Sequence, residues 1–295
     1  SHDIRTPLKG IIGFLPLIEK CVTDEKALGY LHAVRESSEI LIALINDLLD
    51  LSKIESGCLT LVESPIQPEE PAESVLAALS ATANAKGIKM LLVKPADPMS
   101  EVLVDGNRLK QILFNLIGNA VKFTDRGSVT ITVYEQEEEN GLALTYKVAD
   151  TGIGIQPDDL ERIFEPFAQV DAESAQRKGT GLGLSICKSL CRKMNGMLTV
   201  ESTPGTGSDF TATFRCQPAV STPRKPESTR GSCDSVSDSG TGLNILVVDD
   251  AAINRAVLVA NLEELGHQAF EASSAEEALA CVKDERIDLI YMDLR

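Results

Sequence analysis

The spacing of apolar residues changes along the chain, and this change limits the folds that the chain can adopt. Between residues 27 and 56, apolar side chains recur at alternating steps of three and four once Ser38 is counted. They are Leu31, Val34, Leu41, Ile45 and Leu48. Such spacing is typical of a helix in a bundle seam. The stretch from Ile4 to Ile18 has the same spacing, and Thr23-Asp24 supplies a turn, so we predict an antiparallel helical hairpin.

The predicted hairpin is too narrow to cover its own apolar seam. Pairing with a second copy into a four-helix bundle buries the remaining apolar surface. We therefore expect a homodimer through the helical hairpin.

From residue 63 to about residue 218 the pattern changes to a mixture of helices and strands. We expect helices over residues 69–85, 107–123 and 182–194. We expect strands over residues 89–93, 102–104, 129–134, 142–148, 197–202 and 210–215. Pro204-Gly205 and Gly207 supply the turn between the last two strands. This region is predicted to be an α+β sandwich.

The last quarter of the chain begins with a segment of different composition. Residues 219–243 are mostly Ser, Thr, Pro, Gly and charged side chains, which bury too little apolar area to offset chain entropy. We predict a flexible linker there. Strands over 244–248 and 287–292, with a short strand between them, then alternate with helices over 253–265 and 275–283. Such alternation predicts a parallel α/β sheet, and the whole chain is expected to be multidomain.

Charge and composition exclude several classes of protein. The formal charge of −16 repels polyphosphate backbones, so we expect no direct nucleic-acid partner. No apolar run reaches the length of a bilayer. We expect a cytoplasmic portion, and membrane anchoring through segments before residue 1 remains an open alternative. Cys21, Cys187, Cys191 and Cys281 lie in apolar, helix-like runs and are predicted to be buried free thiols.

His2 stands in the segment Ser-His-Asp-Ile-Arg-Thr-Pro. A single histidine near a chain end is usually just solvated. Here Asp3 is able to hydrogen-bond one imidazole nitrogen and leave the other nucleophilic. The segment resembles the phospho-acceptor box of histidine kinases. The resemblance implies that His2 accepts a phosphoryl group, that Asp3 assists it, and that Thr6 positions water for dephosphorylation.

Residues 111–124 place polar side chains on one face of a predicted helix. Gln111, Asn115 and Asn119 lie four residues apart, and Lys122 follows three residues later. Amide oxygens suit Mg²⁺ between phosphates because they ligate a hard cation without adding repulsive charge. The face resembles the N-box of histidine kinases. That resemblance implies Asn119 as a Mg²⁺ ligand, with Asn115 and Lys122 contacting phosphate or metal-bound water; a plain polar surface is the alternative.

The segment Ala-Asp-Thr-Gly-Ile-Gly-Ile at residues 149–155 directly follows a predicted strand. Taken alone, Asp-Thr-Gly is an ordinary turn. In the kinase fold that the sequence resembles, Asp150 accepts a hydrogen bond from the exocyclic amine of adenine. Gly152 and Gly154 then let the backbone approach the base.

A glycine-rich segment follows a stretch, Phe164 to Phe167, that resembles the F-box of the same family. Residues 169–178 are predicted to be a mobile lid. The next segment opens a helix and is expected to present amides to phosphate: Gly179, Thr180, Gly181, Leu182 and Gly183. A Rossmann protein instead carries such glycines after the first strand of a βαβ unit. Arg177 and Lys178 are expected to neutralise charge on the transferred phosphate, although the family often has glycine at position 178.

Acidic residues end two strands of the last predicted sheet. Asp249 and Asp250 follow the first strand and Asp293 follows the last one. The carboxyl ends of parallel strands form the ligand crevice of an open α/β sheet, so three carboxylates there predict a Mg²⁺ site. The arrangement resembles a response-regulator receiver domain and implies Asp293 as its phospho-acceptor. The chain reaches Arg295 before the later strands of such a domain, so we expect a partial flavodoxin-like receiver.

The order and spacing of these motifs resemble those of hybrid sensor histidine kinases. The resemblance implies an N-terminally truncated dimerisation and phosphotransfer hairpin (1–60), an ATP-binding catalytic domain (63–218), the linker (219–243) and a C-terminally truncated receiver domain (244–295). ATP and Mg²⁺ are the implied cofactors. We expect autophosphorylation of His2 and transfer to an aspartate, with a receiver or histidine-phosphotransfer protein as partner. A phosphatase-dominant enzyme and a non-catalytic ATP-gated dimer scaffold remain alternatives.

Overall fold

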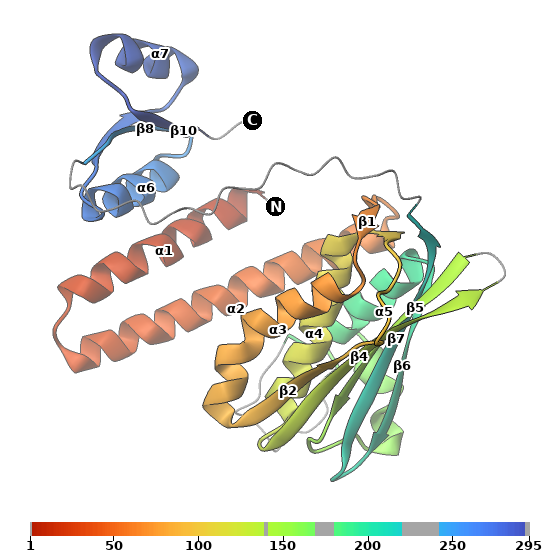
Figure 1. Ribbon diagram of the computed structural model, residues 1–295. Helices are drawn as coiled ribbons and strands as arrows, with labels where there is room; N and C mark the ends of the chain where they lie inside the picture. The colour runs from red at the N-terminus through yellow and green to blue at the C-terminus, as the bar shows by residue number, and fades with distance from the viewer. Residues whose placement is uncertain (1, 139–140, 169–179, 220–241, 293–295) are drawn as a thin grey trace. The chain divides into compact units, whose positions relative to one another are not determined.

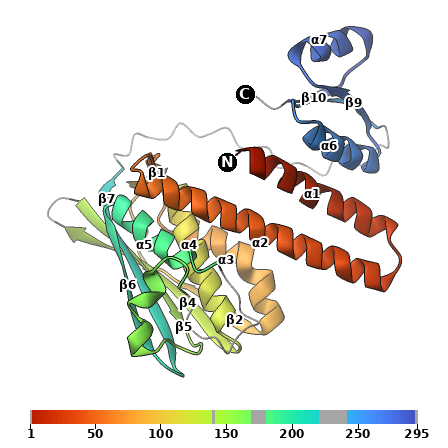
Figure 2. The ribbon, with the colours of Figure 1, turned by 180° about the vertical axis from the view of Figure 1, so that it is seen from behind.

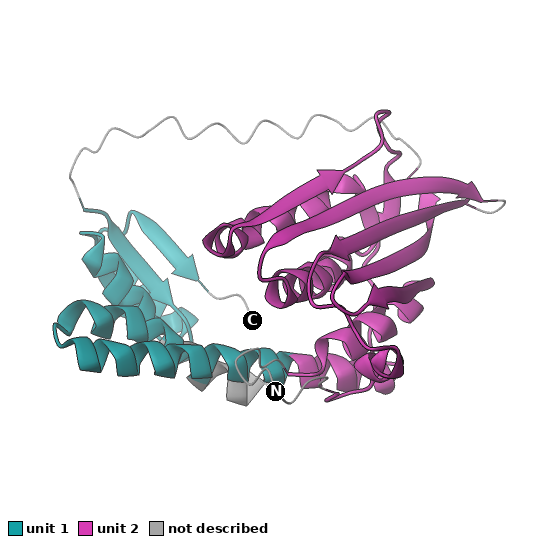
Figure 3. Ribbon diagram, turned by 90° about the horizontal axis from the view of Figure 1, so that it is seen from below, with its two compact units in different colours: residues 1–46, 226–295 teal, residues 47–225 magenta. Residues whose placement is uncertain are grey.

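A computed structural model describes residues 2–138, 141–168, 180–219 and 242–292, apart from the side chains of residues 2–7, 9 and 253. The chain forms two compact units, which Figure 3 distinguishes by colour. One contains residues 1–46 and 226–295, and the other contains residues 47–225. The predicted lid and nearly all of the predicted linker lie outside the described residues. The predicted domain boundaries therefore stay a prediction.

Two long helices open the chain, as predicted (Figure 1). They are α1 (His2–Cys21) and α2 (Glu25–Glu55). The Asp24 carboxylate accepts a hydrogen bond from the Ala27 amide at 2.8 Å and so caps α2. Cys21, predicted to be buried, is exposed because it is the last residue of α1; Cys281 is half-buried, while Cys187 and Cys191 are buried. The six described cysteines are free thiols.

The second unit is built on a seven-stranded sheet. Its strands are β1 (Ser64–Ile66), β2 (Ile88–Val93), β3 (Val102–Val104), β4 (Gly127–Glu138), β5 (Gly141–Asp150), β6 (Gly196–Thr203) and β7 (Gly207–Pro218). The order is β1-β3-β7-β5-β4-β2, and β6 pairs with β7. Only β2 and β4 pair in parallel; the other pairs in this sheet are antiparallel. The predicted α+β sandwich is confirmed, and β1 is a strand that the sequence pattern did not reveal.

Three helices cover one face of this sheet (Figures 1 and 2). They are α3 (Glu69–Lys86), α4 (Gly106–Phe123) and α5 (Gly183–Lys193). Tyr146 and Phe214 belong to the core, where their rings meet edge to face with centroids 6.4 Å apart. The residue before each of them points to the opposite side of its strand, where the Thr145 and Thr213 hydroxyls form a hydrogen bond at 3.1 Å. The helix-covered face of the sheet is therefore apolar, and α4 and α5 pack on it side by side.

The described residues between β5 and α5 lie in turns and short helices. They include two short 3-10 helices, η1 (Pro157–Asp159) and η2 (Arg162–Phe164), which the sequence did not predict. The Lys188 ammonium lies 4.5 Å from the centroid of the Phe164 ring, so η2 is held against α5.

The last part of the chain is a three-stranded sheet whose strands are all parallel. Its elements are β8 (Asn244–Val248), α6 (Ala252–Glu264), β9 (Gln268–Ala272), α7 (Ala275–Asp284) and β10 (Leu289–Met292). The strand order is β10-β8-β9, and the alternating parallel arrangement agrees with the prediction. Leu246, Val248, Ala272 and Ala278 form its core, whereas the side chains of β10 are exposed. Among the described residues, no helix is long and apolar enough to cross a membrane.

Candidate active site

The turn after β5 is organised by Asp150, the last residue of that strand. One oxygen of its carboxylate accepts a hydrogen bond from the Gly152 amide at 2.8 Å. Burial raises the pKa of Asp150, while the amides of Gly152 and Ser208 act against this by stabilising the charged form. The strand pairing places Ser208 directly opposite Asp150 on β7. Nothing in the sequence pointed to Ser208, because the pairing of β5 with β7 is a long-range interaction.

Gly152 and Gly154 are required because other parts of the backbone approach them closely. A Cβ on Gly152 would lie 2.6 Å from the carbonyl oxygen of Phe123, the last residue of α4. Gly154 has a φ of +69°, and a Cβ there would lie 2.1 Å from the carbonyl oxygen of Thr203. The resemblance implied that these glycines make room for a base. In the structure they also make room for α4 and for the hairpin between β6 and β7.

The polar residues of α4 have different neighbours: Asn115 lies near α5, and Lys122 lies at the end of α4. Asn115, Asn119 and Lys122 are half-buried. The Cys187 thiol of α5 donates to the Ile112 carbonyl at 3.8 Å, and the nearby Asn115 side chain acts to lower the pKa of this thiol. Asn115 also lies against Gly183, where an added Cβ would be 3.2 Å from the Asn115 side-chain oxygen. Burial lowers the pKa of Lys122, whose ammonium lies 5.0 Å from the centroid of the Phe123 ring. Asn119 is on the same face between them, four residues after Asn115.

Gln111 is the member of this face that lies elsewhere. Its amide nitrogen donates to the Asp50 carboxylate of α2 at 2.7 Å. Arg108 donates to the same Asp50 oxygen at 3.1 Å and to the Gln111 oxygen at 2.7 Å. Gln111 therefore fastens α4 to the end of α2. Helical periodicity predicted that Gln111 shares a face with the asparagines, but it did not indicate Asp50 as the hydrogen-bond partner of Gln111.

The described part of the glycine-rich segment forms a tight turn into α5. Gly181 has a φ of +72°, and its carbonyl accepts a hydrogen bond from the Phe167 amide at 2.9 Å. The Thr180 hydroxyl oxygen accepts a hydrogen bond from the Leu182 amide at 3.2 Å. The Leu182 side chain is fully buried, so only its backbone is able to meet a ligand. Gly183 is the first residue of α5, as expected of a helix start.

The structure brings together three of the predicted segments along α4. The Asp150 turn lies against the end of α4 through Gly152 and Phe123, and the glycine-rich turn lies against its middle through Gly183 and Asn115. Seven of the predicted residues lie outside what the structure describes. These are the side chains of His2, Asp3 and Thr6, together with Arg177, Lys178, Gly179 and Asp293.

The two acidic residues after β8 are half-buried Asp249 and exposed Asp250. The Asp249 carboxylate accepts hydrogen bonds from the Ala251 amide at 2.7 Å and from the Asn254 side chain at 3.1 Å. Arg255 donates to the Asp249 carbonyl at 2.7 Å. Within the described residues, no three His, Cys, Asp or Glu side chains are grouped to hold a metal ion.

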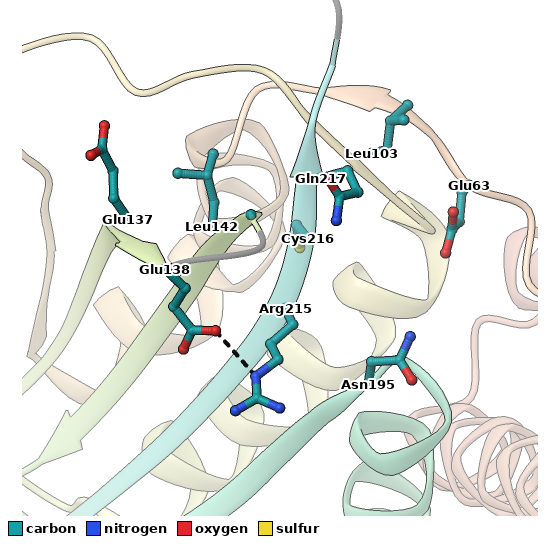
Figure 4. A pocket seen from close by; sticks show the side chains of 10 residues that line it. Glu63, Leu103, Glu137, Glu138, Leu142, Asn195, Arg215, Cys216 and Gln217 are labelled. Atoms are coloured by element: carbon teal, nitrogen blue, oxygen red, sulfur yellow. Dashed lines mark ion pairs between the residues drawn. The ribbon is translucent and has the colours of Figure 1, made fainter.

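A large open cavity of about 1170 Å³ lies at the opposite end of the seven-stranded sheet (Figure 4). In this cavity Arg215 pairs with Glu138 at 3.2 Å. Leu142 of its lining pairs with Cys216, whereas Asp150 pairs with Ser208 at the other end of the same strands. At a rise of about 3.3 Å per residue, the two ends are roughly 26 Å apart. This cavity is therefore separate from the residues around Asp150.

These features define a class of protein: an α+β sandwich, with a glycine-rich turn at a helix start, whose chain begins with a helical hairpin. Comparison with family models agrees. Residues 104–218 match the family described as histidine kinase-, DNA gyrase B-, and HSP90-like ATPase. Residues 1–57 match the His Kinase A (phospho-acceptor) domain.

Individual relatives match over nearly the whole chain. The virulence sensor protein BvgS of Bordetella bronchiseptica is 34% identical over 296 residues, which cover 99% of this chain and 24% of BvgS. Hybrid signal transduction histidine kinase K of Dictyostelium discoideum is 34% identical, covering 100% of this chain and 25% of that protein. The crystal structure of full-length ShkA in complex with AMPPNP has a TM-score of 0.64 and 33% identity, covering 95% of this chain and 56% of ShkA.

The chain belongs to the histidine kinase family, with a phospho-acceptor domain followed by a kinase-type ATPase domain. It spans about a quarter of the length of the two curated relatives.

Proposed function

We propose that this chain is the core of an ATP-dependent protein-histidine kinase that phosphorylates its own His2 and passes the phosphoryl group to an aspartate of a receiver domain. One observation carries the proposal. The middle of α4 meets the glycine-rich turn at Asn115 and Gly183, and its end meets the Asp150 turn at Gly152. Asp150, the proposed acceptor for adenine, and the N-terminus of α5, the proposed phosphate site, are thus both supported by α4.

Each segment has a distinct role in this proposal. Asp150 accepts a hydrogen bond from the adenine amine, and the start of α5 receives phosphate oxygens through its amides. Lys122 adds a positive charge at the end of α4. A nitrogen of His2 attacks the γ-phosphorus, so that a P–N bond forms while the bond from phosphorus to ADP breaks. Catalysis then rests mainly on positioning and charge neutralisation, to which Arg177 and Lys178 contribute.

Mg²⁺ is the metal that suits the amide face of α4. Asn115 and Asn119 offer neutral carbonyl oxygens, which are suitable ligands for a hard cation that already carries anionic phosphates. We assign Asn119 as its protein ligand. When bound, the ion neutralises phosphate charge and fixes the triphosphate.

Dimerisation through the hairpin is part of the proposal. Five described apolar residues of α1 and α2 are 44% to 46% exposed in the single chain, namely Ile11, Ile18, Val34, Leu41 and Leu48. A four-helix bundle of two copies buries such a seam.

We also propose that residues 244–295 are the first part of a receiver domain, with Asp249, Asp250 and Asp293 as its acidic site. The strand order β10-β8-β9 supports this, because it equals the 3-1-2 part of the doubly wound flavodoxin-like order. The exposed side chains of β10 are compatible with further strands beside it. The name of the Dictyostelium relative, a hybrid kinase, points the same way. Because ATP is the substrate, we place this part of the protein in the cytoplasm.

Labelling with γ-labelled ATP tests the kinase proposal. Wild type is expected to acquire acid-labile, base-stable phosphate, and His2→Gln is expected to acquire none. His267→Gln is the matched control, since His267 lies before β9 and its ring accepts a hydrogen bond from the Leu243 amide at 3.2 Å. Equal labelling of His2→Gln and wild type would exclude His2 as the acceptor. Nucleotide binding without any labelling would favour an ATP-gated scaffold.

A further inference from the structure

A carboxylate of α2 reaches the glycine-rich turn. The Thr180 hydroxyl donates to an Asp47 carboxylate oxygen at 3.1 Å, and the same hydroxyl oxygen accepts from the Leu182 amide at 3.2 Å. A single hydroxyl therefore connects the negative charge of Asp47 to an amide at the start of α5. The Asp47 carboxylate and a phosphate oxygen of ATP would both be anions directed at this turn.

Burial around Asp47 strengthens the expected repulsion between its carboxylate and a phosphate oxygen. Asp47 is half-buried, and burial raises its pKa while the Thr180 hydrogen bond lowers it. Its charge also reaches the Cys187 thiol, whose pKa is raised mainly by burial and further by Asp47. The side chain of Asn115, a proposed phosphate contact, acts to lower the pKa of Cys187. Partly buried charges are screened less by salt than exposed ones, so the repulsion of a nearby phosphate is appreciable.

Asp47 is held in this place by its own helix. One turn later on α2, Asp50 accepts hydrogen bonds from Gln111 at 2.7 Å and from Arg108 at 3.1 Å. Both donors belong to α4, which also supports Gly183 through Asn115. The end of α2 is thus fixed to α4 by Asp50, and Asp47 is presented to the turn by a rigid element.

We propose that Asp47 is an autoinhibitory residue: its carboxylate holds the Thr180 hydroxyl on the phosphate-binding turn and competes with the triphosphate for that turn. The inference rests on the proposed function, because it assumes that the glycine-rich turn binds phosphate. Binding of nucleotide then detaches Thr180 from Asp47 and weakens the hold of α2 on the ATP-binding unit. By linkage, formation of the Asp47–Thr180 contact lowers nucleotide affinity by the same factor.

The test compares the full chain with two isosteric variants, Asp47→Asn and Asp50→Asn. Each removes one negative charge from the same helix, but only Asp47 contacts the glycine-rich turn. Titration with AMPPNP and Mg²⁺ is expected to give a dissociation constant about fivefold or more lower for Asp47→Asn than for wild type. For Asp50→Asn a change within about twofold is expected. Thermal unfolding of both variants checks that they are folded.

Salt provides a readout that a purely structural role of Asp47 would not produce. The affinity ratio between Asp47→Asn and wild type is expected to shrink as ionic strength rises, because the competition is electrostatic. Equal tightening by both variants would mean that general release of α2 is responsible and would overturn the role of Asp47. Equal affinities of all three proteins would overturn this inference and leave the kinase proposal intact. Absence of binding in all three would refute the proposed function itself.

Discussion

The substitution Gly154→Ala tests whether the Asp150 turn is as tightly packed as the structure indicates. Gly154 has a φ of +69°, and an added Cβ would lie 2.1 Å from the Thr203 carbonyl oxygen and 3.0 Å from the Pro204 Cα. A left-handed backbone costs a non-glycine residue about 1–2 kcal/mol. The overlap adds roughly 1–3 kcal/mol as the hairpin is pushed aside. We expect a total loss of about 2–5 kcal/mol.

Gly87→Ala is the matched control for the backbone contribution. Gly87 ends α3 with a φ of +70°, and nothing lies within 4 Å of the position of its Cβ. This variant should lose only the conformational part, about 1–2 kcal/mol. The free energy of unfolding is best measured by native-state hydrogen exchange of buried β5 amides, which reports on this unit alone. A loss for Gly154→Ala no larger than for Gly87→Ala would refute the close contact between the turn and the hairpin.

Further expectations concern the site and the core. Asp150→Asn should weaken AMPPNP binding at least about tenfold, because the amide no longer accepts a hydrogen bond from adenine as the carboxylate does. Calorimetry measures the dissociation constant, and Asp125→Asn is the surface control. Because burial raises the pKa of Asp150, its charge is lost at a higher pH than that of an ordinary aspartate as the solution is acidified, so wild-type affinity should fall with decreasing pH while Asp150→Asn stays flat. Tyr146→Phe leaves the Pro68 carbonyl without its hydroxyl donor in the core and should cost about 1–3 kcal/mol in urea unfolding; a loss below about 0.5 kcal/mol would contradict this contact.

Local patterns in the sequence predicted most elements of the fold. The helix over 107–123 and the strand over 102–104 were predicted within a residue of α4 and β3, because apolar spacing is a local signal. The strand β1 was missed because three residues containing Pro65 carry no period of two, and its pairing with β3 is a long-range interaction. Cys21 was wrongly expected to be buried, since periodicity does not reveal which helix face ends at solvent.

The candidate site shows the same division between local and long-range information. Asn115, Asp150 and Gly183 were identified because their motifs carry spacing and turn chemistry within a few residues. The bond from Asp47 to Thr180 joins residues 133 positions apart, and the bond from Gln111 to Asp50 joins residues 61 positions apart. No local pattern specifies such partners, because they depend on how α2, α4 and α5 pack.

The most direct test of the central claim is an experimental structure of the chain with AMPPNP and Mg²⁺. We expect the adenine amine within hydrogen-bonding distance of the Asp150 carboxylate, and the phosphates between Asn119 and the turn from Thr180 to Gly183. A nucleotide bound in the cavity beside Glu138 and Arg215 would contradict the account, as would phosphates far from α4.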